Sequence, residues 1–153
     1  KCYYEKFYFS PSRNNFKVFN IGICKIGVMI CWDQWYANSY RTLTKNGADL
    51  IICPTSIGWA YFNNKMIGLK NDKKKWEMVI RSNSLMNNIP VIVANRTGVE
   101  KKSNHKINFW GSSFITNPHG DIISQAKNKN QYLKITLNLK EKCVAEKYWN
   151  FIK

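Results

Sequence analysis

Short apolar runs separated by polar turns are the main pattern along this chain. Their length and their content of β-branched residues are typical of buried strands. They predict strands over residues 16–19, 25–30, 50–53, 91–94, 112–116, 122–124 and 132–137. The stretch Asn117-Pro118-His119-Gly120-Asp121 predicts a tight turn between two of these strands.

Two helices are predicted between the strands. The first covers residues 37–46 and ends at Gly47. The second covers residues 76–88, because apolar and small polar residues recur there at helical spacing: Trp76, Val79, Ile80, Asn83 and Met86. Residues 58–75 are polar and rich in asparagine and lysine, which predicts a loop or lid. The mixture of strands and helices indicates an α/β fold, and no repeat or linker divides residues 1–153, so we expect a single domain.

The chain is strongly basic, which raises the question of a nucleic-acid partner. Its formal net charge is +15 and 14% of its residues are aromatic, a combination found in nucleic-acid-binding proteins. The charge comes mostly from lysine, however, and the densest run, Lys73-Lys74-Lys75, lies in the predicted loop, where such runs usually form a solvated surface. No nucleic-acid-binding motif accompanies it. We therefore expect no nucleic-acid partner, and a basic binding module remains an alternative.

Apolar content and cysteine spacing bear on the compartment. No apolar stretch approaches the ~20 residues that a membrane-spanning helix needs, so we expect no membrane partner. The sequence contains 5 cysteines, without a CxxC pair and without zinc-ligand spacing. An odd number of cysteines without a disulfide framework fits a reducing compartment. We therefore expect a cytoplasmic protein without a bound metal.

Cys31 occupies the position with the most chemical interest. It stands where the apolar run 25–30 meets a polar, aromatic turn. A thiol between a strand and a helix is exposed at the sheet edge, and the partial positive charge of a helix N-terminus favours the nucleophilic thiolate. Free cysteines are more often small buried hydrophobes, so position alone leaves both interpretations open. A cysteine–histidine dyad is disfavoured, because His105 and His119 lie in polar segments. We expect Asp33 to cap the helix that follows.

The residues around Cys31 narrow the choice. Cys31-Trp32-Asp33-Gln34-Trp35 and the apolar run before it resemble the nucleophile segment of the nitrilase, or carbon–nitrogen hydrolase, superfamily. The segment is most similar to the N-carbamoylputrescine amidohydrolase branch. Residues 4–11, 47–58, 88–98 and 110–115 resemble further family segments in the same order. The resemblance therefore extends over nearly the whole chain.

This resemblance implies a fold and also an incomplete domain. The fold is a four-layer α-β-β-α sandwich. The superfamily uses a glutamate base, a lysine and a cysteine, and the first two lie upstream of the segment that residues 4–11 resemble. We therefore expect the chain to be roughly the second half of a family domain. An inactive fragment remains an alternative to an enzyme.

The resemblance also assigns roles to individual residues. Cys31 is the expected nucleophile, and Glu5 matches a second glutamate that helps to order the site. Substrate contacts are expected from Trp32, Trp35, Thr55 and Ser56. The implied reaction hydrolyses a carbamoyl or linear amide group without a cofactor. Its expected small-molecule substrate is N-carbamoylputrescine, which gives putrescine, ammonia and carbon dioxide in polyamine biosynthesis. A homo-oligomer is implied for the full-length protein, where Asn38 replaces a family glutamate in the pairing region.

Overall fold

A mixed six-stranded sheet forms the centre of the molecule. The computed structural model describes residues 5–10, 16–149 and 151. In spatial order the sheet contains β1 (Val18–Asn20), β2 (Lys25–Val28), β3 (Leu50–Thr55), β6 (Val91–Asn95), β9 (Phe114–Thr116) and β10 (Ile122–Gln125). Strands β2, β3 and β6 are parallel. β1 pairs antiparallel with β2, β9 pairs antiparallel with β6, and β10 pairs antiparallel with β9. The α/β class predicted from the sequence is confirmed.

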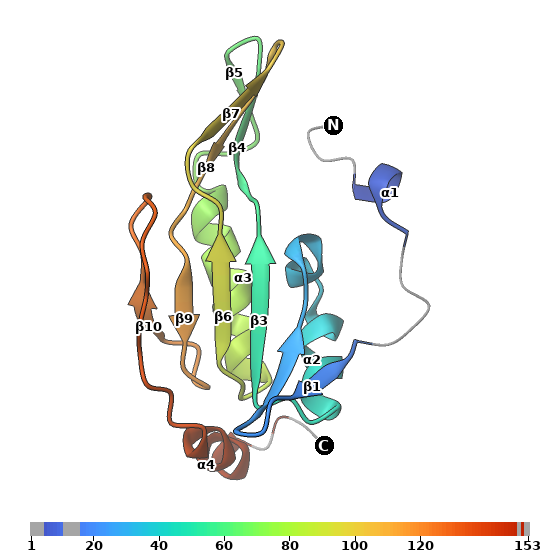
Figure 1. Cartoon of the computed structure of the whole chain (residues 1–153), viewed down its shortest axis with the longest axis vertical. Coiled ribbons are helices and arrows are strands. Elements are labelled where there is room, and N and C mark those ends of the chain that lie inside the picture. The colour runs from blue at the N-terminus through green and yellow to red at the C-terminus, as the bar shows by residue number, and fades with distance from the viewer. Residues whose placement is uncertain (1–4, 11–15, 150, 152–153) are drawn as a thin grey trace.

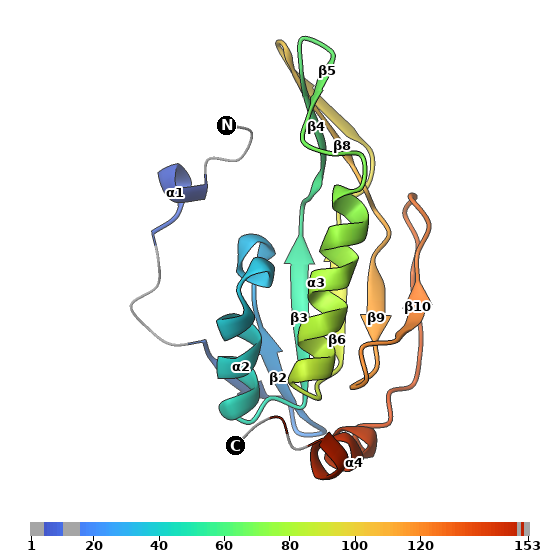
Figure 2. The same cartoon turned by 180° about the vertical axis from the view of Figure 1, so that it is seen from behind.

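Two helices cover one face of this sheet. Figure 2 shows α2 (Ala37–Lys45) and α3 (Asp72–Met86) in front of the strands. Each lies in the connection between two parallel strands, which requires a long crossover. The core between helices and sheet is apolar and tightly buried, and it includes Tyr40, Leu43, Ile51, Trp76, Ile80, Val91, Val93 and Phe114.

The opposite face of the sheet, toward the viewer in Figure 1, is less covered. Along β3 and β6, residues that face the helices are buried, whereas Ile52 and Ile92 are half-buried and Pro54 and Ala94 are exposed. These strands are apolar on both faces, which explains why the sequence shows continuous apolar runs rather than alternation. Such runs are typical of a sheet with a layer on each side.

A second sheet corrects the loop predicted for residues 58–75. It contains, in spatial order, β5 (Lys65–Ile67), β4 (Gly58–Phe62), β8 (His105–Phe109) and β7 (Val99–Lys102), and it projects beyond the central sheet as an arm (Figure 1). Asn63 and Asn64, both with positive φ, form the turn between β4 and β5, as paired asparagines do in tight hairpins. β5 and β7 are largely exposed, whereas β4 is apolar and mostly buried or half-buried, so the loop prediction overlooked one apolar strand.

The predicted helix over 76–88 begins earlier, and one predicted strand is absent. Helix α3 starts at Asp72, whose carboxylate accepts a hydrogen bond from the backbone N–H of Leu69 at 2.7 Å. Lysine is a good helix former, so the run Lys73-Lys74-Lys75 belongs to this helix. Residues 132–137 alternate between half-buried and exposed, but no strand among the described residues pairs with them. The strand predicted over residues 132–137 is therefore wrong, because an alternating pattern forms a strand only where a neighbouring strand pairs with it.

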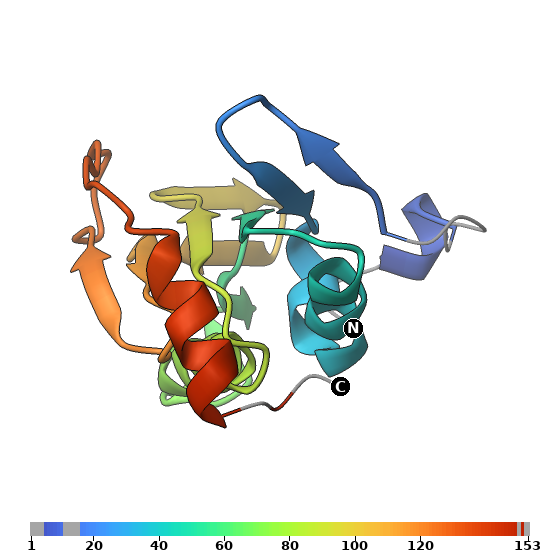
Figure 3. The same ribbon diagram turned by 90° about the horizontal axis from the view of Figure 1, so that it is seen from below.

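Helix α4 (Lys140–Trp149) lies at the lower end of the central sheet in Figure 1, and Figure 3 shows this end of the molecule from below. Its buried residue Lys142 donates a hydrogen bond to the carbonyl of Ala48 at 2.5 Å, and its ammonium lies 3.8 Å from the Asp49 carboxylate. A buried ammonium needs such partners to offset its lost hydration. Lys142 therefore fixes α4 to the loop between α2 and β3. No helix in the described part of the chain is both long and apolar enough to span a bilayer.

Candidate active site

Cys31 lies at the junction between β2 and the helical layer, as the sequence predicted. It is the first residue of a short 3-10 helix, η1 (Cys31–Trp35), which precedes α2. Its φ angle is +48°, in the left-handed region that residues other than glycine rarely adopt. Its side chain is half-buried. A strained backbone that persists in a folded protein is held by its surroundings and is frequent at functional sites.

Asp33 stabilises this turn, although not in the predicted way. Its carboxylate accepts a hydrogen bond from the backbone N–H of Ile30 at 3.0 Å. The carboxylate therefore caps η1, which carries Cys31. Helix α2 starts after Tyr36 without a side-chain cap. The prediction that Asp33 caps the longer helix is wrong, because η1 separates the two helices.

A buried polar cluster lies beneath Cys31. The hydroxyl of Thr55, at the end of β3, lies 3.6 Å from Cys31 Sγ. Gln34 is fully buried, and its Nε2 donates to Thr55 Oγ1 at 2.9 Å while its Oε1 accepts from Trp76 Nε1 at 2.8 Å. The hydroxyl of Tyr40 holds the Gln34 carbonyl at 2.9 Å. Sequence reasoning missed Gln34, although one amide among the aromatic residues of the motif was a signal.

Cys53 belongs to the same cluster but is fully buried. Its Sγ lies 3.8 Å from Gln34 Oε1. Burial raises the pKa of the Cys53 thiol from its ordinary value of 9.0 to about 12, with a smaller contribution from the nearby Cys31. Cys53 is therefore protonated and donates a weak hydrogen bond. Cys24 is also buried, and nothing is described of the side chains of Cys2 and Cys143.

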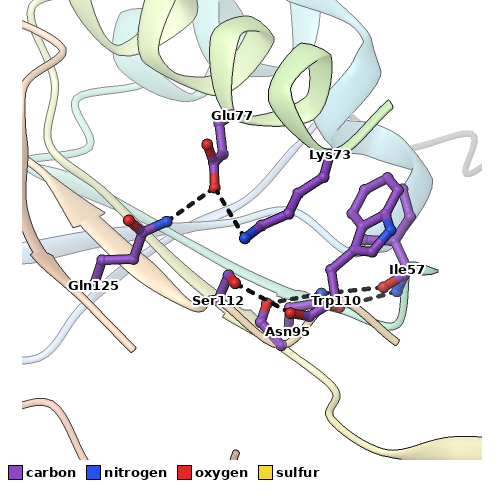
Figure 4. Close-up of polar contacts among 8 residues, drawn as sticks. Ile57, Lys73, Glu77, Asn95, Trp110, Ser112 and Gln125 are labelled. Carbon is purple, nitrogen blue, oxygen red and sulfur yellow. Dashed lines mark hydrogen bonds and ion pairs between the residues drawn. The ribbon is translucent and has the colours of Figure 1, made fainter. Parts of the chain in front are cut away.

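The end of β3 and the loop after it hold the predicted substrate residues Thr55 and Ser56. Thr55 is buried and Ser56 is half-buried. Asn95, at the end of β6, accepts a hydrogen bond from Ile57 N at 2.9 Å and donates to the carbonyls of Ile57 and Gly111 at 3.1 and 3.0 Å. Figure 4 shows the hydrogen bonds that join the Asn95 side chain to Ile57. Asn95 thus fixes the backbone of the loop that follows Thr55 and contains Ser56 and Ile57.

The two predicted tryptophans have different surroundings. Trp32 is 41% exposed, and its indole nitrogen donates to the Tyr36 hydroxyl at 3.3 Å. Trp35 is half-buried and packs against the hydrophobic core. Trp32 therefore offers an aromatic surface next to Cys31, whereas Trp35 packs the turn against the hydrophobic core.

The structure does not test the predicted role of Glu5. Glu5 is the first residue of α1 (Glu5–Tyr8), which lies apart from the sheet in Figures 1 and 2, and its side chain is outside the described part of the structure. His105 and His119 are exposed, as expected. The described residues contain no group of three or more histidine, cysteine or acidic side chains that could hold a metal ion.

Comparison with known proteins identifies the class. The family model for the carbon-nitrogen hydrolases matches residues 2–141. The chain is 33% identical over 152 residues to a citrullinase of Francisella tularensis, covering 99% of this chain and 52% of that protein. It is 35% identical over 133 residues to an N-carbamoylputrescine amidase of Arabidopsis thaliana, covering 84% of this chain and 43% of that protein. The chain therefore belongs to the carbon-nitrogen hydrolase family.

A solved structure supports the same assignment. The carbon-nitrogen hydrolase of Helicobacter pylori G27 superimposes with a TM-score of 0.86 at 31% identity, over 97% of this chain and 52% of that chain. The chain thus spans about half the length of the relatives it matches.

Proposed function

We propose that this chain carries the nucleophile of a hydrolase that cleaves a C–N bond in a terminal carbamoyl group. The observation that carries the proposal is the half-buried thiol of Cys31, held at a φ of +48° with the Thr55 hydroxyl 3.6 Å from its sulfur. N-carbamoylputrescine is the proposed substrate. It shares its ureido group with citrulline, and both substrates are named in relatives of the chain.

In the proposed mechanism, Cys31 Sγ attacks the carbamoyl carbon. A new S–C bond forms, the C–N bond breaks, and the leaving nitrogen receives the thiol proton through a glutamate. Water then cleaves the S–C bond and regenerates the thiol, and the released carbamate decomposes to carbon dioxide and the second amine. The oxyanion is stabilised by the backbone N–H of Trp32 and by a lysine ammonium. We propose that the base and this lysine belong to the part of the family domain that this chain does not span. Glu5 is proposed as a carboxylate that orders the site.

The proposed recognition of the cationic tail relies on aromatic surface. An ammonium above an indole ring gains about 0.5–2 kcal/mol, and Trp32 is the exposed indole beside Cys31. The net charge of +15 repels a cation at long range, but this repulsion is screened beyond about 8–10 Å at physiological salt. Local contacts should therefore determine which ureido compound is preferred.

The nucleophile assignment is tested in the natural full-length protein that contains this chain. Cys31→Ala should abolish ammonia release from N-carbamoylputrescine, whereas Cys24→Ala, at a buried cysteine in the connection from β1 to β2, should not. Turnover by the Cys31→Ala variant would refute the assignment. The ratio of kcat/KM for N-carbamoylputrescine to that for citrulline and β-ureidopropionate tests the substrate. A preference for either competitor would refute the branch and leave the family membership intact.

Light scattering of the same sample tests the proposed homo-oligomer.

The 153-residue chain alone should be nearly inactive. Among the described residues, no glutamate or lysine side chain is hydrogen-bonded to Cys31. Loss of one oxyanion donor costs about 10²–10³ in rate, and loss of a general base costs about 10²–10⁴. Ammonia release by the purified chain at a kcat on the order of 10 s⁻¹ would show that the chemistry needs neither group. Salt-dependent binding of the inactive chain to nonspecific DNA would instead favour the alternative of a basic binding module.

A further inference from the structure

We propose that Gln34 and Thr55 are positioning residues that direct a hydroxyl proton at Cys31 Sγ, through a chain of hydrogen bonds that begins at the buried indole of Trp76. This inference rests on the proposed function only in taking Cys31 as the nucleophile. It concerns how the protein core controls the sulfur, and its test does not require turnover.

The direction of the chain is set at Trp76. An indole N–H can only donate, and Trp76 Nε1 lies 2.8 Å from the side-chain amide of Gln34. The atom that faces Trp76 must therefore be the amide oxygen. The protonated thiol of Cys53 is a second donor to this oxygen, at 3.8 Å. Two donors on one side fix which end of the Gln34 amide is oxygen and which is nitrogen, an assignment that geometry alone leaves open.

The direction then passes to Thr55. With its oxygen held by Trp76, Gln34 presents its NH₂ group to Thr55 Oγ1 at 2.9 Å. The hydroxyl oxygen accepts this bond, so its single hydrogen is available for another acceptor. The sulfur of Cys31 lies 3.6 Å away. Each hydrogen bond in the chain is thus oriented from the core toward the nucleophile.

Burial protects this orientation. Gln34 and Trp76 are both 0% exposed and Thr55 is 9% exposed, so water does not compete for their hydrogen bonds. The Tyr40 hydroxyl also holds the Gln34 backbone at 2.9 Å. A donor that points at sulfur favours the charged nucleophile over the neutral thiol, and a low local dielectric strengthens this effect.

The test is the rate at which iodoacetamide alkylates Cys31 between pH 6 and 10, with the modified peptide quantified by mass spectrometry. Thr55→Val removes the hydroxyl donor and keeps the branched shape. It should lower the rate at pH 7 by about tenfold, since a hydrogen bond to a charged group is at stake, and move the midpoint of the rate–pH curve upward. Thr55→Ser restores a hydroxyl and should stay within about twofold of the wild type. A Thr55→Val curve that matches the wild type, or falls equally at every pH, would overturn the inference.

Gln34→Glu tests the direction of the chain while Thr55 stays in place. A carboxylate has two accepting oxygens and no donor, so the Thr55 hydroxyl would turn to it and away from the sulfur. We expect the same upward movement of the midpoint as in Thr55→Val, and an unchanged midpoint in a folded Gln34→Glu protein would overturn the inference. If Gln34→Glu does not fold, the Thr55 pair decides. Persistent turnover in Cys31→Ala would remove the proposed function and leave the alkylation result standing.

Discussion

An alkylating reagent should distinguish Cys31 from Cys53 by at least three orders of magnitude in the native protein. Reactivity follows the thiolate fraction and exposure. Cys53 is 0% exposed, and burial raises its pKa from 9.0 to about 12. At pH 8 a thiol with a pKa of 12 is ionised to about 10⁻⁴, compared with about 10⁻¹ for one with a pKa of 9. The raised pKa therefore lowers the thiolate fraction of Cys53 about a thousandfold, and complete burial restricts access of the reagent to the thiolate that remains.

The assay uses sub-stoichiometric iodoacetamide at pH 8, followed by tryptic digestion. Arg41 and Lys45 lie between the two cysteines in the sequence, so each cysteine falls in its own peptide. The control is the same reaction in concentrated guanidinium, where both thiols are ordinary and should react within a few-fold of each other. Cys24, which is buried outside the site, reports whether any labelling of Cys53 comes from general opening of the fold.

Comparable labelling of Cys31 and Cys53 in the native protein, with Cys24 protected, would refute the reasoning. It would mean that Cys53 is accessible and ionisable at neutral pH. The second donor to the Gln34 amide would then be lost, and the orientation of that amide would depend on Trp76 alone.

The remaining predictions concern stability and are measured by chemical denaturation. Gly58→Ala should lower the free energy of unfolding by about 2–3 kcal/mol, because a Cβ there would lie 2.6 Å from Phe109 Cα. The control Gly98→Ala, in open space at a φ of +90°, should lower it by about 1 kcal/mol. Equal losses in the two variants would contradict the clash at Gly58. Asn95→Asp should lower the free energy of unfolding by about 2–4 kcal/mol, because the carbonyls of Ile57 and Gly111 lose their donor. An unchanged unfolding midpoint would contradict the role of Asn95 in fixing the loop. Between about pH 9 and 12 the unfolded chain releases the Cys53 proton and the folded chain keeps it. The free energy of unfolding of the wild type should therefore fall with pH about 1.4 kcal/mol per pH unit more steeply than that of Cys53→Ala. Parallel slopes of the two proteins would contradict the raised pKa of Cys53.

The central strands could be predicted from the sequence for a clear physical reason. Residues 50–53 and 91–94 are apolar at every position, and β3 and β6 each lie between two paired neighbours in the centre of the sheet. The junction at Cys31 was predictable for the same reason, since the apolar run ends there. The arm was not predicted, because β5 and β7 are short and largely exposed, and the apolar segment of β4 is surrounded by polar residues.

The site was only partly predictable. Position and resemblance predicted Cys31 and Thr55 as site residues, but the contact between them joins residues 24 apart in sequence. The role of Gln34 depends on Trp76, which is 42 residues away on α3. The helical spacing of Trp76 predicted a helix there, and the structure buries its side chain completely. Its indole N–H also serves the site, a function that no periodicity can indicate.

The parallel arrangement of β2, β3 and β6 explains why these residues meet. The carboxyl ends of parallel strands lie at one edge of a sheet, where ligand sites of α/β proteins form. Cys31 follows the end of β2, Thr55 ends β3 and Asn95 ends β6, and the register pairs Thr55 directly with Asn95. The loop that Asn95 fixes leads into β4, so the arm begins at the same edge (Figure 1). A change in the arm near Gly58 should therefore reach Cys31 through Thr55, whereas a change at the tip of the arm should not.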